Sequence, residues 1–109
     1  MSSNLPKPIA DYIAGSNARD ANDAALPFAD DAIVRDEGHD HKGLAAIRAW
    51  KAETVEKYHP IVEVLDAAQV DGRTVVTGRV SGDFPGSPVE LRYAFTLAGD
   101  KISRLEIVT

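Results

Sequence analysis

The chain has 109 residues, of which 44% are hydrophobic and 27% are charged, a composition ordinary for a globular protein. Its net charge of -5 and its interspersed lysines and arginines argue against a nucleic-acid partner, because phosphate binding requires clustered basic residues. It contains no cysteine, which excludes disulfides and a cysteine-ligated zinc site.

The length predicts a single domain over residues 1–109 with a small core, and a homodimer would help it to bury apolar surface. The first residues, MSSNLPKPIADYIAG, lack the long apolar run of a signal peptide or a membrane span. We therefore expect no membrane partner and a cytoplasmic location.

A short first helix is predicted from Ile9, Tyr12 and Ile13, which follow the i, i+3, i+4 spacing of one helix face. Pro8 suits its first turn, where a missing N–H has little consequence. Gly15 to Asn17 should end this helix.

A second helix is predicted from about Ala21 to Leu26, with Asp20 as its N-cap. Pro27 should stop it, because proline disfavours helical geometry in the preceding residue. Ala32 to Asp36 then indicates a short strand, and Arg35 to Gly43 (RDEGHDHKG) is predicted to be the loop that follows.

The third helix, predicted from Leu44 to Tyr58, has the clearest helical periodicity and ends before His59-Pro60. The predicted inner face consists of Leu44, Ile47, Trp50, Thr54 and Tyr58. The charged residues are predicted mostly outside that face: Arg48, Lys51, Glu53, Glu56 and Lys57.

Beyond Pro60 the apolar period changes to two, which predicts antiparallel strands joined by turns. The predicted strands are Ile61–Val70, Thr74–Gly82, Val89–Leu97 and Ile102–Val108, with a loop at Phe84–Pro88. The apolar phase shifts between Ile102 and Leu105, which predicts a bulge or an edge irregularity there. Helices followed by a meander indicate an α+β fold, with a curved antiparallel sheet wrapped around three helices to form a cone with an internal pocket.

The His39-Asp40-His41 stretch could ligate a metal, since alternate residues of an extended segment point to the same side. A site needs a third or fourth ligand, and the sequence offers no other obvious candidate. We therefore predict no metal and place His39 and His41 at the rim of the pocket. Plain solvent-exposed surface is the alternative.

The run from Asp11 to Trp50 resembles the nuclear transport factor 2-like superfamily, in particular its SnoaL-like and ketosteroid-isomerase-like branch. The residues typical of the family are Tyr12-Ile13, Asn17, Asp20, Phe28 to Ala32, Asp36, Gly43 and Ile47-Arg48. The C-terminal stretch LRYAFTLAGDKISRLEI fits as well, so the resemblance covers nearly the whole chain. This fold hosts many unrelated activities, so the resemblance is stronger for fold than for reaction.

The isomerase branch implies three functional positions. Tyr12 matches the tyrosine that donates a hydrogen bond to the developing enolate, and Asp36 matches the aspartate base. Leu91 stands where the family has a protonated aspartate, so the second oxyanion donor is missing. Two structural alternatives stay open: Tyr12 as a core residue, and Asp36 as a turn residue.

The resemblance thus implies cofactor-free acid–base chemistry, of isomerase or cyclase type, on a small apolar carbonyl compound. Polyketide cyclisation is one such reaction. The alternative is a non-catalytic ligand-binding or dimerisation module of the same fold, which Leu91 favours. The residues expected to line the pocket are Phe28, His39, His41, Trp50, Leu91, Tyr93 and Phe95, with the core as the alternative place for Trp50, Tyr93 and Phe95.

Overall fold

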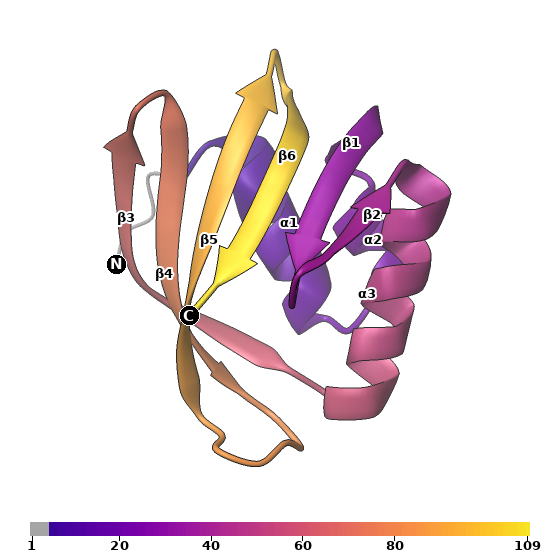
Figure 1. Ribbon diagram of the computed structural model, residues 1–109, viewed down its shortest axis with the longest axis vertical. Coiled ribbons are helices and arrows are strands. Elements are labelled where there is room, and N and C mark those ends of the chain that lie inside the picture. Colours follow the sequence, from indigo (N-terminus) through magenta and orange to yellow (C-terminus); the bar gives the residue numbers. More distant parts are fainter. Residues whose placement is uncertain (1–4) are drawn as a thin grey trace.

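In the computed structural model, which describes residues 5–109, helices cover one face of a curved six-stranded sheet (Figure 1). The helices are α1 (Lys7–Asn17), α2 (Ala21–Ala25) and α3 (Leu44–Tyr58). The strands are β1 (Phe28–Asp36), β2 (His39–Lys42), β3 (Ile61–Val70), β4 (Arg73–Ser81), β5 (Val89–Ala98) and β6 (Lys101–Val108). They lie in the order β2-β1-β6-β5-β4-β3, and the α+β class is as predicted.

The sheet is not wholly antiparallel. Strands β3 to β6 form the predicted antiparallel meander, but β1 lies parallel to β6, with Val34 opposite Leu105. A parallel pair needs a long crossover connection, and here α3 and the strands β3 to β5 supply it. The predicted curved antiparallel sheet is thus present in the meander, and the β1–β6 pairing adds a parallel neighbour to it.

The segment predicted as a loop after β1 is a β-hairpin. Strand β2 runs antiparallel to β1, with Asp36 opposite His39. Glu37 and Gly38 form the two-residue turn, and both have positive φ (53° and 76°), as such turns require. Strand β2 consists entirely of charged residues and histidines, so it shows none of the apolar alternation that marks a strand in a sequence.

The predicted N-cap and bulge are both confirmed. The Asp23 backbone N–H donates to the Asp20 carboxylate at 3.1 Å. In β6, Arg104 lies opposite Thr96 but Ile102 lies opposite Leu97, so Ser103 is the extra residue of a bulge.

Strand β1 begins at Phe28, earlier than the predicted Ala32. Phe28 is almost fully buried and pairs with Ile102 of β6. Asp30 and Asp31 follow in the same strand and are exposed. Because these residues are polar, the first part of β1 lacks the apolar pattern from which a strand is predicted.

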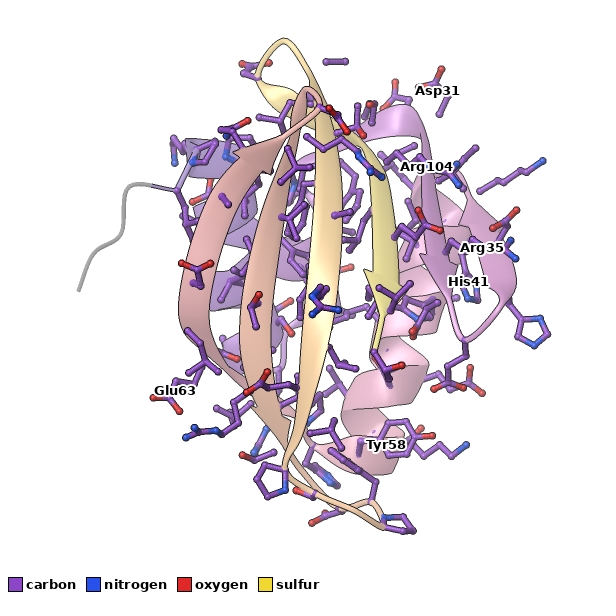
Figure 2. The ribbon with its side chains drawn as sticks, turned by 60° about the vertical axis from the view of Figure 1, so that its left-hand side comes forward. Asp31, Arg35, His41, Tyr58, Glu63 and Arg104 are labelled. Carbon is purple, nitrogen blue, oxygen red and sulfur yellow. The ribbon has the colours of Figure 1, made fainter. Side chains whose placement is uncertain are left out.

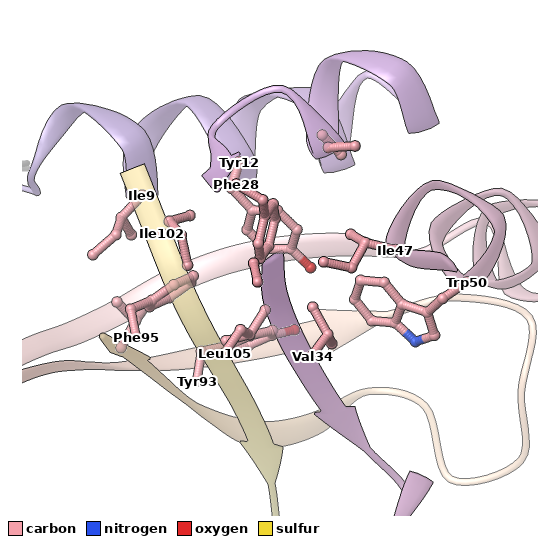
Figure 3. Packing of buried hydrophobic residues seen from close by; sticks show 14 of the residues in the cluster. Ile9, Tyr12, Phe28, Val34, Ile47, Trp50, Tyr93, Phe95, Ile102 and Leu105 are labelled. Atoms are coloured by element: carbon pink, nitrogen blue, oxygen red, sulfur yellow. The ribbon is translucent and has the colours of Figure 1, made fainter. Parts of the chain in front are cut away.

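The core lies between the helices and the covered face of the sheet. In Figure 1, α1 lies behind the strands and α3 stands to their right, and in Figure 2 the strands lie in front of the helices. Its fully buried members include Ile9, Tyr12, Phe28, Phe95 and Leu105, which come from α1 and from three strands (Figure 3). Among residues 5–109, no helix has the length and apolar character needed to cross a membrane.

Candidate active site

A cavity of about 640 Å³ opens between α3 and the sheet, with walls from α1, β1, β5, β6 and the β4–β5 connection. Tyr12, Asp36, Trp50, Leu91 and Tyr93 all line it. Figure 2 shows Tyr58 at the end of α3 beside the β4–β5 connection, where its ring meets Phe84 edge-on at 5.8 Å between centroids. A larger hollow of about 760 Å³ lies over α1 and α2 and contains none of the predicted site residues, so we place the chemistry in the first cavity.

Tyr12 is at once a core residue and a cavity residue. Its side chain is only 1% exposed, and its ring packs edge-on against Phe28 and Phe95, with centroids 5.6 and 5.9 Å away. The Lys51 Nζ donates to its hydroxyl oxygen at 3.1 Å. Burial, with a smaller effect of Tyr93 and Asp36, raises the pKa of Tyr12 well above its usual value, so the hydroxyl stays protonated.

Asp36 is the last residue of β1, and its carboxylate is half-buried. Its Oδ2 accepts a hydrogen bond of 3.1 Å from the Trp50 indole Nε1–H. Indole has only this one donor, so a largely buried Trp50 both satisfies its polar atom and orients the carboxylate. Asp36 is therefore held by a specific partner at the edge of the cavity.

Lys51 also lines the cavity, with only 5% of its surface exposed. Its Nζ lies 5.0 Å from the ring centroids of both Tyr12 and Trp50. Burial lowers the pKa of Lys51 to about 8, and the nearby Asp36 carboxylate opposes this shift. On the cavity wall, the Asp36 carboxylate and the Lys51 ammonium are thus each hydrogen-bonded to a separate aromatic residue.

A SnoaL-like domain model matches residues 9–105 of the chain. The chain belongs to the SnoaL-like domain family. A provisionally named polyketide cyclase from Sinorhizobium meliloti is 36% identical over 96% of each chain, with a TM-score of 0.91. A protein from Sphaerobacter thermophilus is 28% identical, over 93% of this chain and 91% of that one, with a TM-score of 0.73.

The fold is also that of ketosteroid-isomerase-like proteins. One from Catenulispora acidiphila, solved with trimethylamine, has a TM-score of 0.85 over 97% of this chain and 87% of that one. At 18% identity this likeness shows the SnoaL-like fold and no more. No curated protein matches the chain.

Several residues expected to line the pocket of this SnoaL-like chain do not reach the cavity. Phe28 and Phe95 are fully buried in the core, where both pack against the Tyr12 ring. His39 is exposed at the start of β2. His41 packs against Trp50 at 5.9 Å between ring centroids, but on the outer hairpin beside Arg35 (Figure 2).

The positions of the two histidines have one cause. The β1–β2 hairpin pairs its backbone along β1, which keeps both histidines on the sheet edge rather than over the mouth of the cavity. Within residues 5–109, no group of three or more His, Asp or Glu side chains has a metal-binding arrangement.

Lys51 is the site residue that the sequence analysis missed, because it was assigned to the outer face of α3. Its spacing contained a signal: Ile47, Lys51 and Thr54 follow i, i+4, i+7 along one helix face. A lysine in such a stripe is normally read as surface, since lysines are seldom fully buried. The burial of Lys51 depends on the Tyr12 hydroxyl, which α1 supplies.

Proposed function

We propose that this SnoaL-like protein catalyses cofactor-free acid–base chemistry, of isomerase or cyclase type, on a small apolar carbonyl compound bound in the cavity. The observation that carries the proposal is that a hydroxyl and a carboxylate, from Tyr12 and Asp36, line one largely apolar cavity. The Sinorhizobium meliloti relative, named for polyketide cyclisation, supports a reaction of the same class.

In this mechanism the Asp36 carboxylate removes a proton from the carbon next to the substrate carbonyl. Its hydrogen bond from Trp50 engages Oδ2, which leaves Oδ1 as the basic atom. The Tyr12 hydroxyl donates to the carbonyl oxygen as negative charge develops there. Asp36 then returns the proton to another carbon. In a cyclisation, the enolate carbon instead bonds to a second carbonyl carbon, the π pair of that carbonyl moves to its oxygen, and Asp36 returns the proton to the resulting alkoxide.

Deuterium uptake from D2O at the α-carbons of a panel of small ketones and 1,3-dicarbonyl compounds, followed by NMR, tests this function. The wild type should accelerate exchange for at least one compound. Asp36→Asn should slow that exchange by about 100-fold or more, the usual contribution of a general base. Tyr12→Phe should slow it by about 100- to 1000-fold, as expected for loss of an oxyanion donor.

The same experiment separates the enzyme from a non-catalytic binding module. Compounds that bind, seen as shifts of their NMR lines, but never exchange would favour the binding module, which Leu91 at the second donor position also favours. Exchange that survives in Asp36→Asn would show that Asp36 is not the base.

We also propose that the chain pairs as a homodimer through the sheet, on the side away from the helices. In support, β3 leaves Ile61 and Leu65 each 40% exposed, which is unusual for large apolar side chains of a strand. Light scattering at micromolar concentration should give twice the 11.7 kDa chain mass. A monomer mass would contradict the proposal.

A further inference from the structure

The Lys51 ammonium is buried beside the cavity with most of its hydrogen-bonding capacity unused. An ammonium carries three N–H donors. Within residues 5–109, the Tyr12 hydroxyl is the acceptor that the structure gives it. Because Lys51 lines the cavity, its remaining donors are available to a bound molecule.

Lys51 and Asp36 are opposite charges on the wall of one cavity, yet the ion pairs found in residues 5–109 do not join them. Each is held by another partner, Lys51 by Tyr12 and Asp36 by Trp50. A buried charge without a counter-charge is costly to a folded protein. A ligand that brings an anionic oxygen to Lys51 would remove that cost.

We propose that Lys51 and Tyr12 together form an oxyanion subsite, and that the ligands of this cavity carry an oxygen that is anionic when bound. The ligand class is enolates of 1,3-dicarbonyl compounds and phenolates. The inference rests on the proposed function for its place in a reaction, but the binding that it predicts requires no turnover.

The hydrogen-bond direction supports this subsite. Since Lys51 donates to the Tyr12 oxygen, the Tyr12 proton stays free for donation to a ligand, and the structure gives it no acceptor among residues 5–109. Lys51 thus supplies the second electrophilic group that the family places where this chain has Leu91. In the reaction, Asp36 takes the proton, the C–H electron pair becomes the new C=C bond and the C=O π pair moves to the oxygen, while Lys51 stays protonated throughout.

The protonation state of Lys51 agrees with this role. A pKa of about 8 leaves the ammonium as the main form at pH 7. The other titratable groups that line the cavity, from every element around it, are Tyr12, Asp36, Glu37, Tyr58 and Tyr93. Burial raises the pKa of Tyr93 as it does that of Tyr12, so both stay neutral and Lys51 is the cation that meets an anionic ligand.

The test is binding of 4-nitrophenol, which titrates near neutral pH and absorbs visible light only as the phenolate. Absorbance titrations from pH 5 to 9 give the affinities of the phenol and phenolate forms. The wild type should bind the phenolate about tenfold more tightly than the phenol, which lowers the pKa of the bound phenol by about one unit. Lys51→Met, similar in shape but uncharged, should abolish the preference.

Two matched variants sharpen the test. Asp36→Asn removes the carboxylate that acts electrostatically on Lys51. It should strengthen the phenolate preference, an effect opposite in sign to that of Lys51→Met. Lys42→Met removes an exposed lysine of β2 and should bind as the wild type does. Urea unfolding of each variant checks that it is folded before binding is compared.

A wild type that fails to bind 4-nitrophenol, or binds it without preferring the phenolate, overturns the inference. So does a Lys51→Met variant that keeps the wild-type preference. Absence of deuterium exchange, in contrast, would count against the proposed function and leave this binding result intact. If deuterium exchange depends on Asp36 but Lys51→Met keeps the wild-type preference for the phenolate, the oxyanion subsite is overturned and the proposed function stands.

Discussion

The Trp50 indole nitrogen lies 3.1 Å from the Asp36 carboxylate, and this hydrogen bond links α3 to the end of β1. The next residue along α3, Lys51, makes the corresponding link to Tyr12 of α1. Two consecutive residues of one helix thus position both side chains proposed to act on the substrate. Figure 3 shows the Trp50 ring entering the cluster from α3 and Tyr12 entering from α1.

The Trp50–Asp36 pair should show energetic coupling. The free energies of unfolding in urea are compared for Trp50→Phe, Asp36→Ala and the double variant. Either single variant already removes the hydrogen bond, so the double variant should lose about 1–2 kcal/mol less than the sum of the two single losses. Asp40, which pairs with Arg35 on the hairpin, is the control, and its cycle with Trp50→Phe should give almost no coupling. Equal couplings for the two aspartates would contradict the assignment.

Lys51→Met should stabilise the protein at pH 7. The pKa of Lys51 falls from 10.5 unfolded to about 8 folded, so the folded state binds the proton less well than the unfolded chain. This difference in pKa corresponds to a destabilisation of the wild type by at most about 3 kcal/mol. Because Lys51→Met also loses the hydrogen bond to Tyr12, its net gain in the free energy of unfolding should be about 1–3 kcal/mol.

The sign of the pH dependence follows from the same shift. Between pH 8 and 10.5 the unfolded chain holds a proton that the folded protein has lost, so the wild type gains stability as the pH rises through this window. The difference in free energy of unfolding between Lys51→Met and the wild type should therefore fall by about 2 kcal/mol between pH 7 and 9.5. A constant difference between the two proteins across these pH values would mean that Lys51 titrates normally.

Asn17 should stabilise the contact between α1 and β3. Its Nδ2 donates to the Val62 carbonyl oxygen at 2.9 Å, and its Oδ1 accepts from the Val62 N–H at 2.8 Å. Asn17→Asp keeps the acceptor but replaces the donor with a carboxylate oxygen facing a carbonyl, so it should cost about 1–3 kcal/mol at pH 7 in urea unfolding. Asn22→Asp, an exposed change of the same kind in α2, should stay within about 0.5 kcal/mol, and similar losses at both sites would refute this role.

Gly15 should be required by the close approach of α1 to α2. A Cβ at this position would lie 2.6 Å from the Ala24 nitrogen and 2.8 Å from the Asp23 carbonyl carbon. Both are backbone atoms, so no side-chain rotation can relieve the clash. Gly15→Ala should therefore destabilise the protein by about 1–3 kcal/mol, although alanine is the better helix former by about 1 kcal/mol. A lower melting temperature is expected, and a higher one would mean that the helices separate easily.

Local patterns predicted most of the elements. The bounds of α3 followed from its periodicity and from His59-Pro60, and the bulge at Ser103 followed from the phase shift of the last strand. Tyr12 and Asp36 were identified through the family resemblance, and both line the cavity. Strand β2 was missed because its residues are polar throughout, and a strand of that kind forms only where a neighbouring strand offers its edge.

The sequence by itself determined the helices, the antiparallel meander and the residues that could do chemistry, because these depend on periodicity, turn residues and side-chain type over short stretches. Tertiary structure alone decided that β1 lies parallel to β6, that Phe28 and Phe95 belong to the core, and that Lys51 is buried. The physical reason is that these features depend on contacts between distant segments. The hydroxyl that receives the Lys51 hydrogen bond lies 39 residues away in the chain, and only folding brings the two groups together.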